Sequence, residues 1–300
     1  MTKFIDIHAH GMYEPCCPVF EGPTGQPLCS PDELLGWWDK LGVEKGVILP
    51  ETAPESPSIL NTQSNEEMLR FCKTHPDRFI PFCNVDPRNV FNDSTTPFTR
   101  ILQHYKDMGF KGIGEVTCNL RIEDSRCQAL FAAIEEVGFP MIPQFAPFMG
   151  ETYGFVDLPG LPGLEETLKR FPKLKVLGHS QAFWCEIGTY EGQECRFNYP
   201  VGPVTEGRLP YLMRKYPNLC GDLSAASGAN ALMRDKEYGI KFMNEFQDRL
   251  FFGLDIARPF EVRSKLPGYL RGLLAEGAIS QEVFDKIARK NAVKLLGLED

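Results

Sequence analysis

The chain has 300 residues, of which 40 are acidic and 32 basic, and its formal net charge is −8 at pH 7. This acidic balance argues against a nucleic-acid partner, and no stretch approaches the roughly 18 uninterrupted apolar residues of a membrane helix. The ten cysteines are scattered without a C-x-x-C pair, so we expect them to be reduced. The first residues show no secretory leader pattern. We therefore expect a cytoplasmic protein with a small-molecule ligand.

The first predicted strand, residues 4–10, has the sequence Phe-Ile-Asp-Ile-His-Ala-His. Because a strand alternates its faces, His8 and His10 point the same way. Two neighbouring imidazoles supply half of a zinc site. Asp6 is expected on the same face, where it either orients an imidazole or accepts a backbone hydrogen bond.

The next elements follow in regular alternation. A segment rich in Pro and Gly, residues 11–29, predicts a long loop. The capping box Ser30-Pro31-Asp32-Glu33 opens a helix that stops at Gly42, and residues 45–49 form a short apolar strand. A second capping box at residues 64–67 opens another helix, which precedes a strand at 79–85.

The middle of the chain repeats the pattern with polar residues near strand ends. Amphipathic segments predict helices over 97–108, 124–137 and 164–171. The strands that follow them are expected at residues 110–116 with Glu115, 139–145 with Gln144, and 174–180 with His179.

The last third begins with a second long loop, residues 181–203, which is rich in aromatic and polar residues. After it we expect helices over 209–216, 229–246 and 280–296 and strands over 219–225 and 250–256. The last of these strands ends at Asp255.

Eight alternations of strand and helix in 300 residues predict a single (β/α)8 TIM barrel of class α/β over residues 1–300. The long loops at 11–29 and 181–203 would then cover its C-terminal mouth. A doubly wound open sheet is the competing fold. The barrel is favoured because polar residues recur at strand C-termini, and no G-x-G-x-x-G sequence supports a dinucleotide site.

Three further residues are candidates for chemistry at the mouth. Asp255 would project beside the first strand, since strands one and eight are neighbours in a closed barrel, although it could instead cap a helix. Glu115 is either a metal ligand or a structural hydrogen-bond acceptor. His179 is either a metal ligand or an acid-base group.

In this order, the phrases FIDIHAH, GIGEV, LKVLGHS and LFFGLDI resemble the amidohydrolase superfamily, in particular the group that includes aminocarboxymuconate semialdehyde decarboxylase-like proteins. The resemblance implies a distorted TIM barrel with a divalent metal, usually zinc and alternatively manganese, held by His8, His10 and Asp255. Family members commonly add a histidine at the end of strand five, where this chain has Gln144, a poor zinc ligand. Glu115 offers a replacement, which favours one metal ion and leaves His179 free for catalysis.

The first functional hypothesis is hydrolysis of a small amide, lactone or ester by a metal-activated water. Asp255 would accept the proton of the water and pass it to the leaving group, while His179 would polarise the carbonyl. Arg258 and Arg121 could fix a substrate carboxylate. Aromatic residues of the long loops could form a ring-binding wall or pack the loops themselves: Tyr13, Phe20, Phe183, Trp184, Tyr190 and Tyr199.

Two alternatives remain open at this stage. Non-oxidative decarboxylation of a small carboxylic acid is known among relatives, but the absence of the strand-five histidine weakens it. A non-catalytic binding scaffold is the third hypothesis, because fold does not imply function. Assembly is also open, with a homodimer as the commonest form of soluble enzymes.

Overall fold

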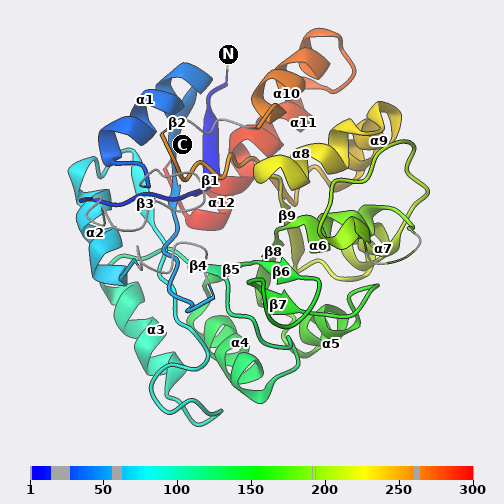
Figure 1. Ribbon diagram of the computed structural model, residues 1–300. Coiled ribbons are helices and arrows are strands. Elements are labelled where there is room, and N and C mark those ends of the chain that lie inside the picture. The colour runs from blue at the N-terminus through cyan, green and yellow to red at the C-terminus, as the bar shows by residue number, and fades with distance from the viewer. Residues whose placement is uncertain are drawn as a thin grey trace.

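The sheet of the computed structural model consists of parallel strands that close into a barrel (Figure 1). Residues 2–14, 28–55, 63–190, 192, 194–259 and 264–299 are described by the structure. One arc of the barrel has three strands in the order β1-β2-β3: β1 (Phe4–Ala9), β2 (Val43–Ile48) and β3 (Phe79–Pro81). The other has five in the order β10-β9-β8-β5-β4: β4 (Ile113–Val116), β5 (Pro140–Pro143), β8 (Lys175–Gly178), β9 (Leu219–Asp222) and β10 (Leu250–Phe251).

Parallel bridges join the two arcs at both seams. Cys83 pairs with Ile113 between β3 and β4, and Ala9 pairs with Ile256 between β10 and β1. The predicted (β/α)8 barrel is therefore confirmed, and the doubly wound alternative is wrong. A short extra pair, β6 (Phe145–Ala146) and β7 (Phe155–Val156), follows β5.

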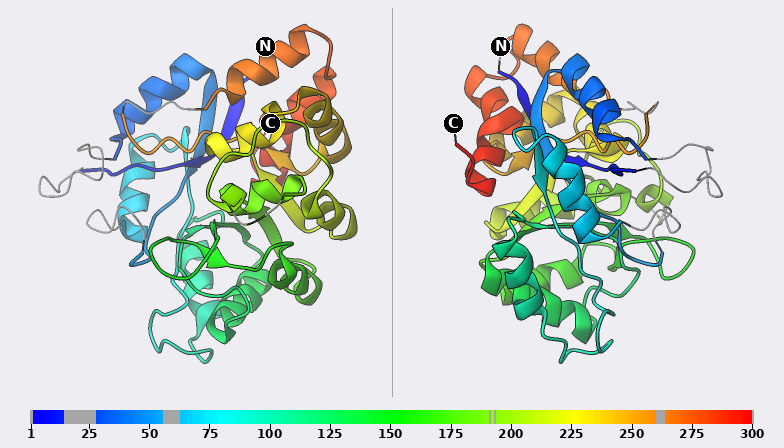
Figure 2. Two further views of the ribbon diagram at one scale, coloured as in Figure 1. Left: turned by 45° about the vertical axis from the view of Figure 1, so that its right-hand side comes forward. Right: turned by 90° about the vertical axis from the view of Figure 1, so that its left-hand side faces the viewer.

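Helices surround the strands on the outside (Figures 1 and 2). Those that were expected are α1 (Pro31–Leu41), α2 (Asn65–Thr74), α3 (Phe98–Asp107), α4 (Ser125–Val137), α5 (Pro162–Arg170) and α7 (Arg208–Lys215). Capping residues in the sequence set the ends of these helices. Ser30 and Glu33 form the predicted capping box of α1, and Gly42 ends this helix in a left-handed conformation with φ 77°.

The helices of the last third differ from the prediction. The single helix expected over 229–246 is two helices, α8 (Ala225–Met233) and α9 (Lys236–Phe246), because the Asp235 side chain accepts a hydrogen bond from the Tyr238 amide and starts a new helix. Helix α10 (Leu266–Ala275) was not expected, and its Pro267 lies in the first turn.

The C-terminal helix is interrupted. It comprises α11 (Gln281–Asp285), a π-helical turn (Lys286–Lys290) and α12 (Asn291–Leu296).

The expected loop 181–203 contains α6 (Gln181–Trp184) and two 3-10 turns, Cys185–Ile187 and Glu194–Arg196. The loop expected at 11–29 lies largely outside the described residues.

Two apolar clusters hold the barrel together. The larger one fills the space between strands and helices, and it includes the stacked rings of Phe4 and Phe252 at 4.0 Å between centroids. The smaller one lies inside the barrel and packs against α12; its strand residues include Ile5, Ile7, Val47, Ile142 and Leu177. In the described part of the chain, every helix is too short or too polar to span a bilayer.

Candidate metal and active site

His8 and His10 present the lone pairs of their Nε2 atoms to one point. His10 Nδ1 lies 2.9 Å from the carbonyl oxygen of Leu49, and His8 Nδ1 lies 2.7 Å from the carboxylate of Asp222. A carbonyl and a carboxylate only accept, so both Nδ1 atoms carry a proton, and in the neutral imidazoles both Nε2 atoms are available to bind a metal ion. These Nε2 atoms are 3.0 Å apart. Two facing lone pairs repel unless a cation or proton lies between them.

Two carboxylates complete the cluster. Glu115 Oε2 lies 3.6 Å from His8 Nε2 and 3.5 Å from His10 Nε2. Asp255 Oδ1 lies at the same distances, 3.6 Å and 3.5 Å, from these two atoms. Ligands bound about 2.0–2.2 Å from a common ion are separated by roughly 3.0–3.6 Å, so the spacing and the N and O donors fit a divalent metal.

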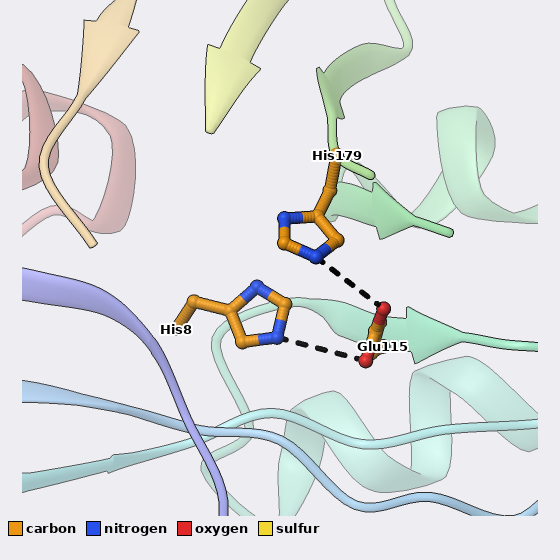
Figure 3. A group of neighbouring side chains, drawn as sticks. All are labelled: His8, Glu115 and His179. Carbon is orange, nitrogen blue, oxygen red and sulfur yellow. Dashed lines mark ion pairs between the residues drawn. The ribbon is translucent and has the colours of Figure 1, made fainter. Parts of the chain in front are cut away.

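Three overlapping groups of possible ligands result: His8 with His10 and Asp255, His8 with Glu115 and His179, and His10 with Glu51 and Glu115. Figure 3 shows the second of them, in which the Glu115 carboxylate lies beside both imidazoles and pairs with each. His179 Nε2 is 3.8 Å from Glu115 Oε1. Glu51 was not singled out in the sequence.

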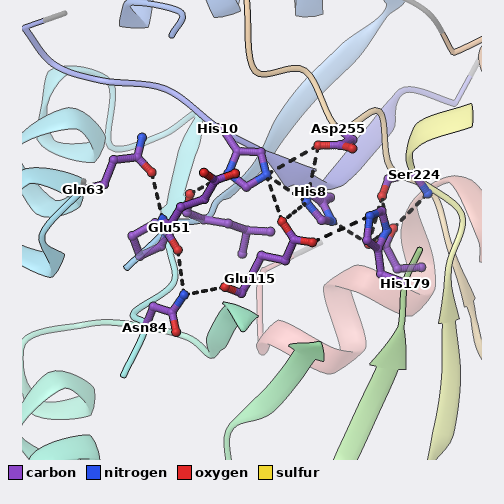
Figure 4. Close-up of polar contacts among 12 residues, drawn as sticks. His8, His10, Glu51, Gln63, Asn84, Glu115, His179, Ser224 and Asp255 are labelled. Atoms are coloured by element: carbon purple, nitrogen blue, oxygen red, sulfur yellow. Dashed lines mark hydrogen bonds and ion pairs between the residues drawn. The ribbon is translucent and has the colours of Figure 1, made fainter. Parts of the chain in front are cut away.

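Asp222 contacts His8 and His179 and anchors both imidazoles. Figure 4 shows these two imidazoles with Glu115, Asp255 and Ser224 around them. The Oδ2 atom of Asp222 contacts His8 Nδ1, lies 3.2 Å from His179 Nδ1, and accepts a hydrogen bond from the Ser224 hydroxyl at 2.9 Å. Ser224 Oγ is also 3.0 Å from His179 Nδ1. Gly253 allows this close packing, since a Cβ there would lie 2.9 Å from Asp222 Oδ1.

Asp6, in contrast, contacts no imidazole. Its carboxylate accepts hydrogen bonds from the Trp38 indole at 3.0 Å and from the amides of His8 and Leu254. A register shift between Asp6 and Ala9 interrupts the strand alternation, so Asp6 does not share the contacts of His8. The backbone-binding interpretation of Asp6 is confirmed. Burial raises its pKa to about 7.

The electrostatics of the cluster favour added positive charge. Burial opposes charging of His8, but the carboxylates of Asp222 and Asp255 outweigh it and hold the His8 pKa well above its usual value. Burial likewise opposes ionisation of Asp255 and Glu115, yet the histidines lower the pKa of both carboxyl groups. Without a cation the site would take up a proton, and a divalent ion would replace it.

A cavity of about 270 Å³ opens beside this cluster. Its lining includes His179, Asp255, Gln144, Tyr153 and Tyr199. Gln144 is buried, and its Oε1 has no hydrogen-bond partner among the residues that the structure describes. Burial first, and then the charges of Glu115 and Glu51, raise the pKa of Tyr153, so this phenol is neutral. None of the described lining residues is Lys or Arg.

Four residues considered from the sequence lie elsewhere. Trp184 is buried in the core, where its indole donates to the carbonyl of Asp222 at 2.8 Å. Arg121 is exposed and pairs with Glu123 at 3.1 Å. Tyr13 stacks under the guanidinium of Arg70 at 4.8 Å, and Arg258 is half-buried outside the described cavity lining. The structure therefore does not bring Trp184, Arg121, Tyr13 or Arg258 to the cavity.

The structure adds Asp222, Ser224, Glu51 and Tyr153 to the predicted residues. Asp222 ends an apolar run at the C-terminal end of β9, which is the same signal that identified Glu115 and Asp255. Glu51 similarly follows the apolar end of β2. Tyr153 lies in a loop without periodicity, and the sequence offers no signal for its position.

Comparisons with known proteins place this geometry in a wider context. A sequence profile described as Amidohydrolase matches residues 5–298, whereas no curated protein matches in sequence. The chain is similar to the solved structure of an uncharacterized TIM-barrel protein from Bordetella bronchiseptica, with a TM-score of 0.66, 18% identity and 99% of each chain covered.

Two other solved structures are similar over the whole chain. One is 5-carboxyvanillate decarboxylase from Sphingomonas paucimobilis, with a TM-score of 0.62, 16% identity and 99% of each chain covered. The other is a probable 2-pyrone-4,6-dicarboxylic acid hydrolase from Acinetobacter baumannii, with a TM-score of 0.58, 15% identity, and 99% of this chain and 100% of that chain covered. At such identities the likeness concerns the fold alone.

Proposed function

The chain belongs to the amidohydrolase family, and from this premise we propose that it is a metal-dependent hydrolase of a small amide, lactone or ester. The observation that carries the proposal is the pair of Nε2 atoms of His8 and His10, 3.0 Å apart and flanked by two carboxylates. His8, His10 and Asp255 would hold one divalent ion, zinc or manganese, with Glu115 as a further ligand. Bound there, the ion supplies Lewis acidity, which polarises oxygen and lowers the pKa of water to about 7.

Asp255 is the proposed proton acceptor. Its lowered pKa keeps it ionised at neutral pH, and 28% of its side chain remains exposed toward the cavity region. In the reaction, water adds to the acyl carbon while Asp255 takes its proton. Asp255 then returns this proton to the departing oxygen or nitrogen as the acyl bond breaks. His179, on the same cavity, is placed to polarise the carbonyl oxygen.

The absence of Lys and Arg from the described cavity lining favours hydrolysis over decarboxylation. A decarboxylase must bind a carboxylate at the reacting position, and without Lys or Arg in the described lining this carboxylate would have only the metal ion as its positive partner. Decarboxylation remains the second candidate because two phenol side chains, Tyr153 and Tyr199, line the cavity and suit a ring-bearing acid.

Metal content and turnover test the proposal together. Protein purified without chelator should contain about one zinc or manganese per chain, and the His10→Ala and Glu115→Ala variants should both lose it. The loaded wild type should hydrolyse members of a lactone, ester and amide panel, and Asp255→Asn should lower kcat/KM by about 100-fold to 10,000-fold. The exposed Asp248→Asn serves as the matched control.

Three results would count against the proposal. Unchanged turnover in Asp255→Asn would remove its assigned role. Release of carbon dioxide from aromatic acids, with no hydrolysis of the panel, would establish the second candidate instead. A wild type without metal would exclude the ion and leave the binding scaffold.

A further inference from the structure

Helix α8 links the candidate metal centre to a second pocket. The helix begins directly after Ser224, whose hydroxyl contacts His179 and Asp222. Its first residues, Ala225 and Ala226, line the cavity that contains His179 and Asp255. Figure 1 shows α8 near α6, and the two helices are in contact.

The second pocket has a volume of about 480 Å³ and lies along one face of α8. Ala226, Ala229, Asn230 and Met233 line it, and these positions are three or four residues apart, so they share a face of the helix. Ala226 and Tyr199 line both the second pocket and the catalytic cavity. A molecule with its reacting group at Asp255 can therefore continue along the small side chains of α8.

Arg234 lies at the far end of this face. It lines the second pocket, and its Nε is buried without a hydrogen-bond partner. No ion pair of Arg234 occurs among the described residues, and the carboxylate of the adjacent Asp235 instead accepts from the amides of Val204 and Tyr238. A guanidinium stays charged in proteins, and the described residues that line this pocket include no Asp or Glu, so the pocket favours an anion. Lys265, also on this pocket, adds a second cation.

Resting on the proposed hydrolase activity, we infer that the substrate is an elongated acyl compound with a carboxylate at the end remote from the reacting carbonyl. The carboxylate binds Arg234, the apolar middle lies on Ala226 and Ala229, and the neutral ester, lactone or amide reaches Asp255. Eight residues separate Ala226 from Arg234, which is about 12 Å along the helix. The guanidinium of Arg234 lies beside Gly188, where an added Cβ would be 2.5 Å from Nη2.

The distribution of charge fixes the direction of binding. Arg234 and Lys265 line the second pocket and attract a carboxylate there, whereas no Lys or Arg is among the described residues that line the catalytic cavity. The neutral end of the substrate is therefore the one presented for hydrolysis.

The first experiment measures binding alone, with nonanoate and nonanol as probes that cannot be hydrolysed and differ in their charged end. By titration calorimetry on metal-loaded protein, the wild type should bind nonanoate at least about 10-fold more tightly than nonanol. Arg234→Gln should weaken nonanoate binding by about 10-fold to 100-fold and leave nonanol unchanged, and Arg234→Lys should retain part of the affinity. Lys236→Gln, which removes an exposed cation paired with Glu276, is the control and should have no effect.

The second experiment compares monomethyl azelate with methyl nonanoate as substrates. Water adds across the acyl–oxygen bond of each ester to release an acid and methanol. We expect kcat/KM to favour monomethyl azelate by at least about 10-fold, and Arg234→Gln to abolish this preference. Ala229→Phe, which fills the second pocket, should lose activity on monomethyl azelate but keep it on the short monomethyl succinate.

The outcomes separate the two proposals. Equal hydrolysis of both esters, unchanged by Arg234→Gln, would overturn the carboxylate site and leave the hydrolase function intact. Equal binding of nonanoate and nonanol in the wild type would also overturn this site. Binding of nonanoate that depends on Arg234, with no ester hydrolysed, would support the carboxylate site and overturn the hydrolase function.

Discussion

Asp222 is the residue on which the candidate metal site depends most, although it would not itself bind the ion. It holds Nδ1 of His8 and approaches Nδ1 of His179, so it fixes the tautomer and direction of the first imidazole. Carboxylates in this position typically contribute 10-fold to 100-fold to metal affinity. We expect Asp222→Asn to weaken zinc binding by about that factor in competition with a chelating dye.

The exposed Asp248→Asn variant provides the control for the Asp222 experiment. It should bind zinc as the wild type does. If Asp222→Asn also bound zinc with unchanged affinity, the positioning role of this carboxylate would be excluded.

Trp184 lies in a segment that the sequence predicts to be a loop, yet its side chain is buried in the core. Its ring packs against Gly221, where an added Cβ would lie 2.7 Å from the indole, and its Nε1 bonds the carbonyl of Asp222. Trp184→Phe removes the donor and leaves that buried carbonyl unpaired, which costs about 1–3 kcal/mol. Denaturant unfolding should show the loss of stability. A change of KM alone, at unchanged stability, would instead restore the substrate-binding interpretation.

At the scale of the elements, the segment after β3 is held by a charged group of three. Arg88 pairs with Asp86 at 2.6 Å and binds both oxygens of Glu55. Burial works against ionisation of Glu55, but the Arg88 hydrogen bonds outweigh it and lower the Glu55 pKa. A carboxyl group with a lowered folded-state pKa stabilises the protein above its unfolded pKa of about 4.3, and this contribution is lost as the pH falls.

The Glu55→Gln variant should therefore melt below the wild type above about pH 5, and the gap in Tm should close toward about pH 3. Thermal unfolding followed by circular dichroism across this range measures the gap. Glu66→Gln, on the surface of α2, is the control and should show no such dependence. A gap that widened on acidification would contradict the sign of the argument.

The strands were predictable because each is an apolar run. The polar residues at the C-terminal ends of these runs gave the candidate site residues His8, His10, Glu115, His179 and Asp255. The contacts that cross the barrel could not be predicted from the sequence. Asp222 ends a strand like the others, but its contact with His8 joins β9 to β1, which are not adjacent in the sheet. The register shift in β1 redirected Asp6, and the break before Asp235 depended on a cap inside an otherwise helical pattern. The sequence contains these residues, but it does not show which other residues they contact.

For the whole molecule, metal binding should contribute to stability. A ligand that binds only the folded state adds about 2.7 kcal/mol at a concentration 100 times its Kd. Treatment with a chelator should therefore lower Tm by several degrees, and added zinc or manganese should restore it. His10→Ala should have a Tm that does not respond to either treatment. An identical response in this variant would place the ion elsewhere.

The division of the barrel into two arcs has a consequence for protein fragments. His8 and His10 belong to the three-stranded arc, whereas Glu115, His179 and Asp222 belong to the five-stranded arc. A peptide ending before β4 would carry His8 and His10, and the complementary peptide would carry Glu115 and Asp255, so neither could form the complete centre. High-affinity metal binding would then report reassembly of the two peptides. The site could therefore be used to measure complementation of a split chain.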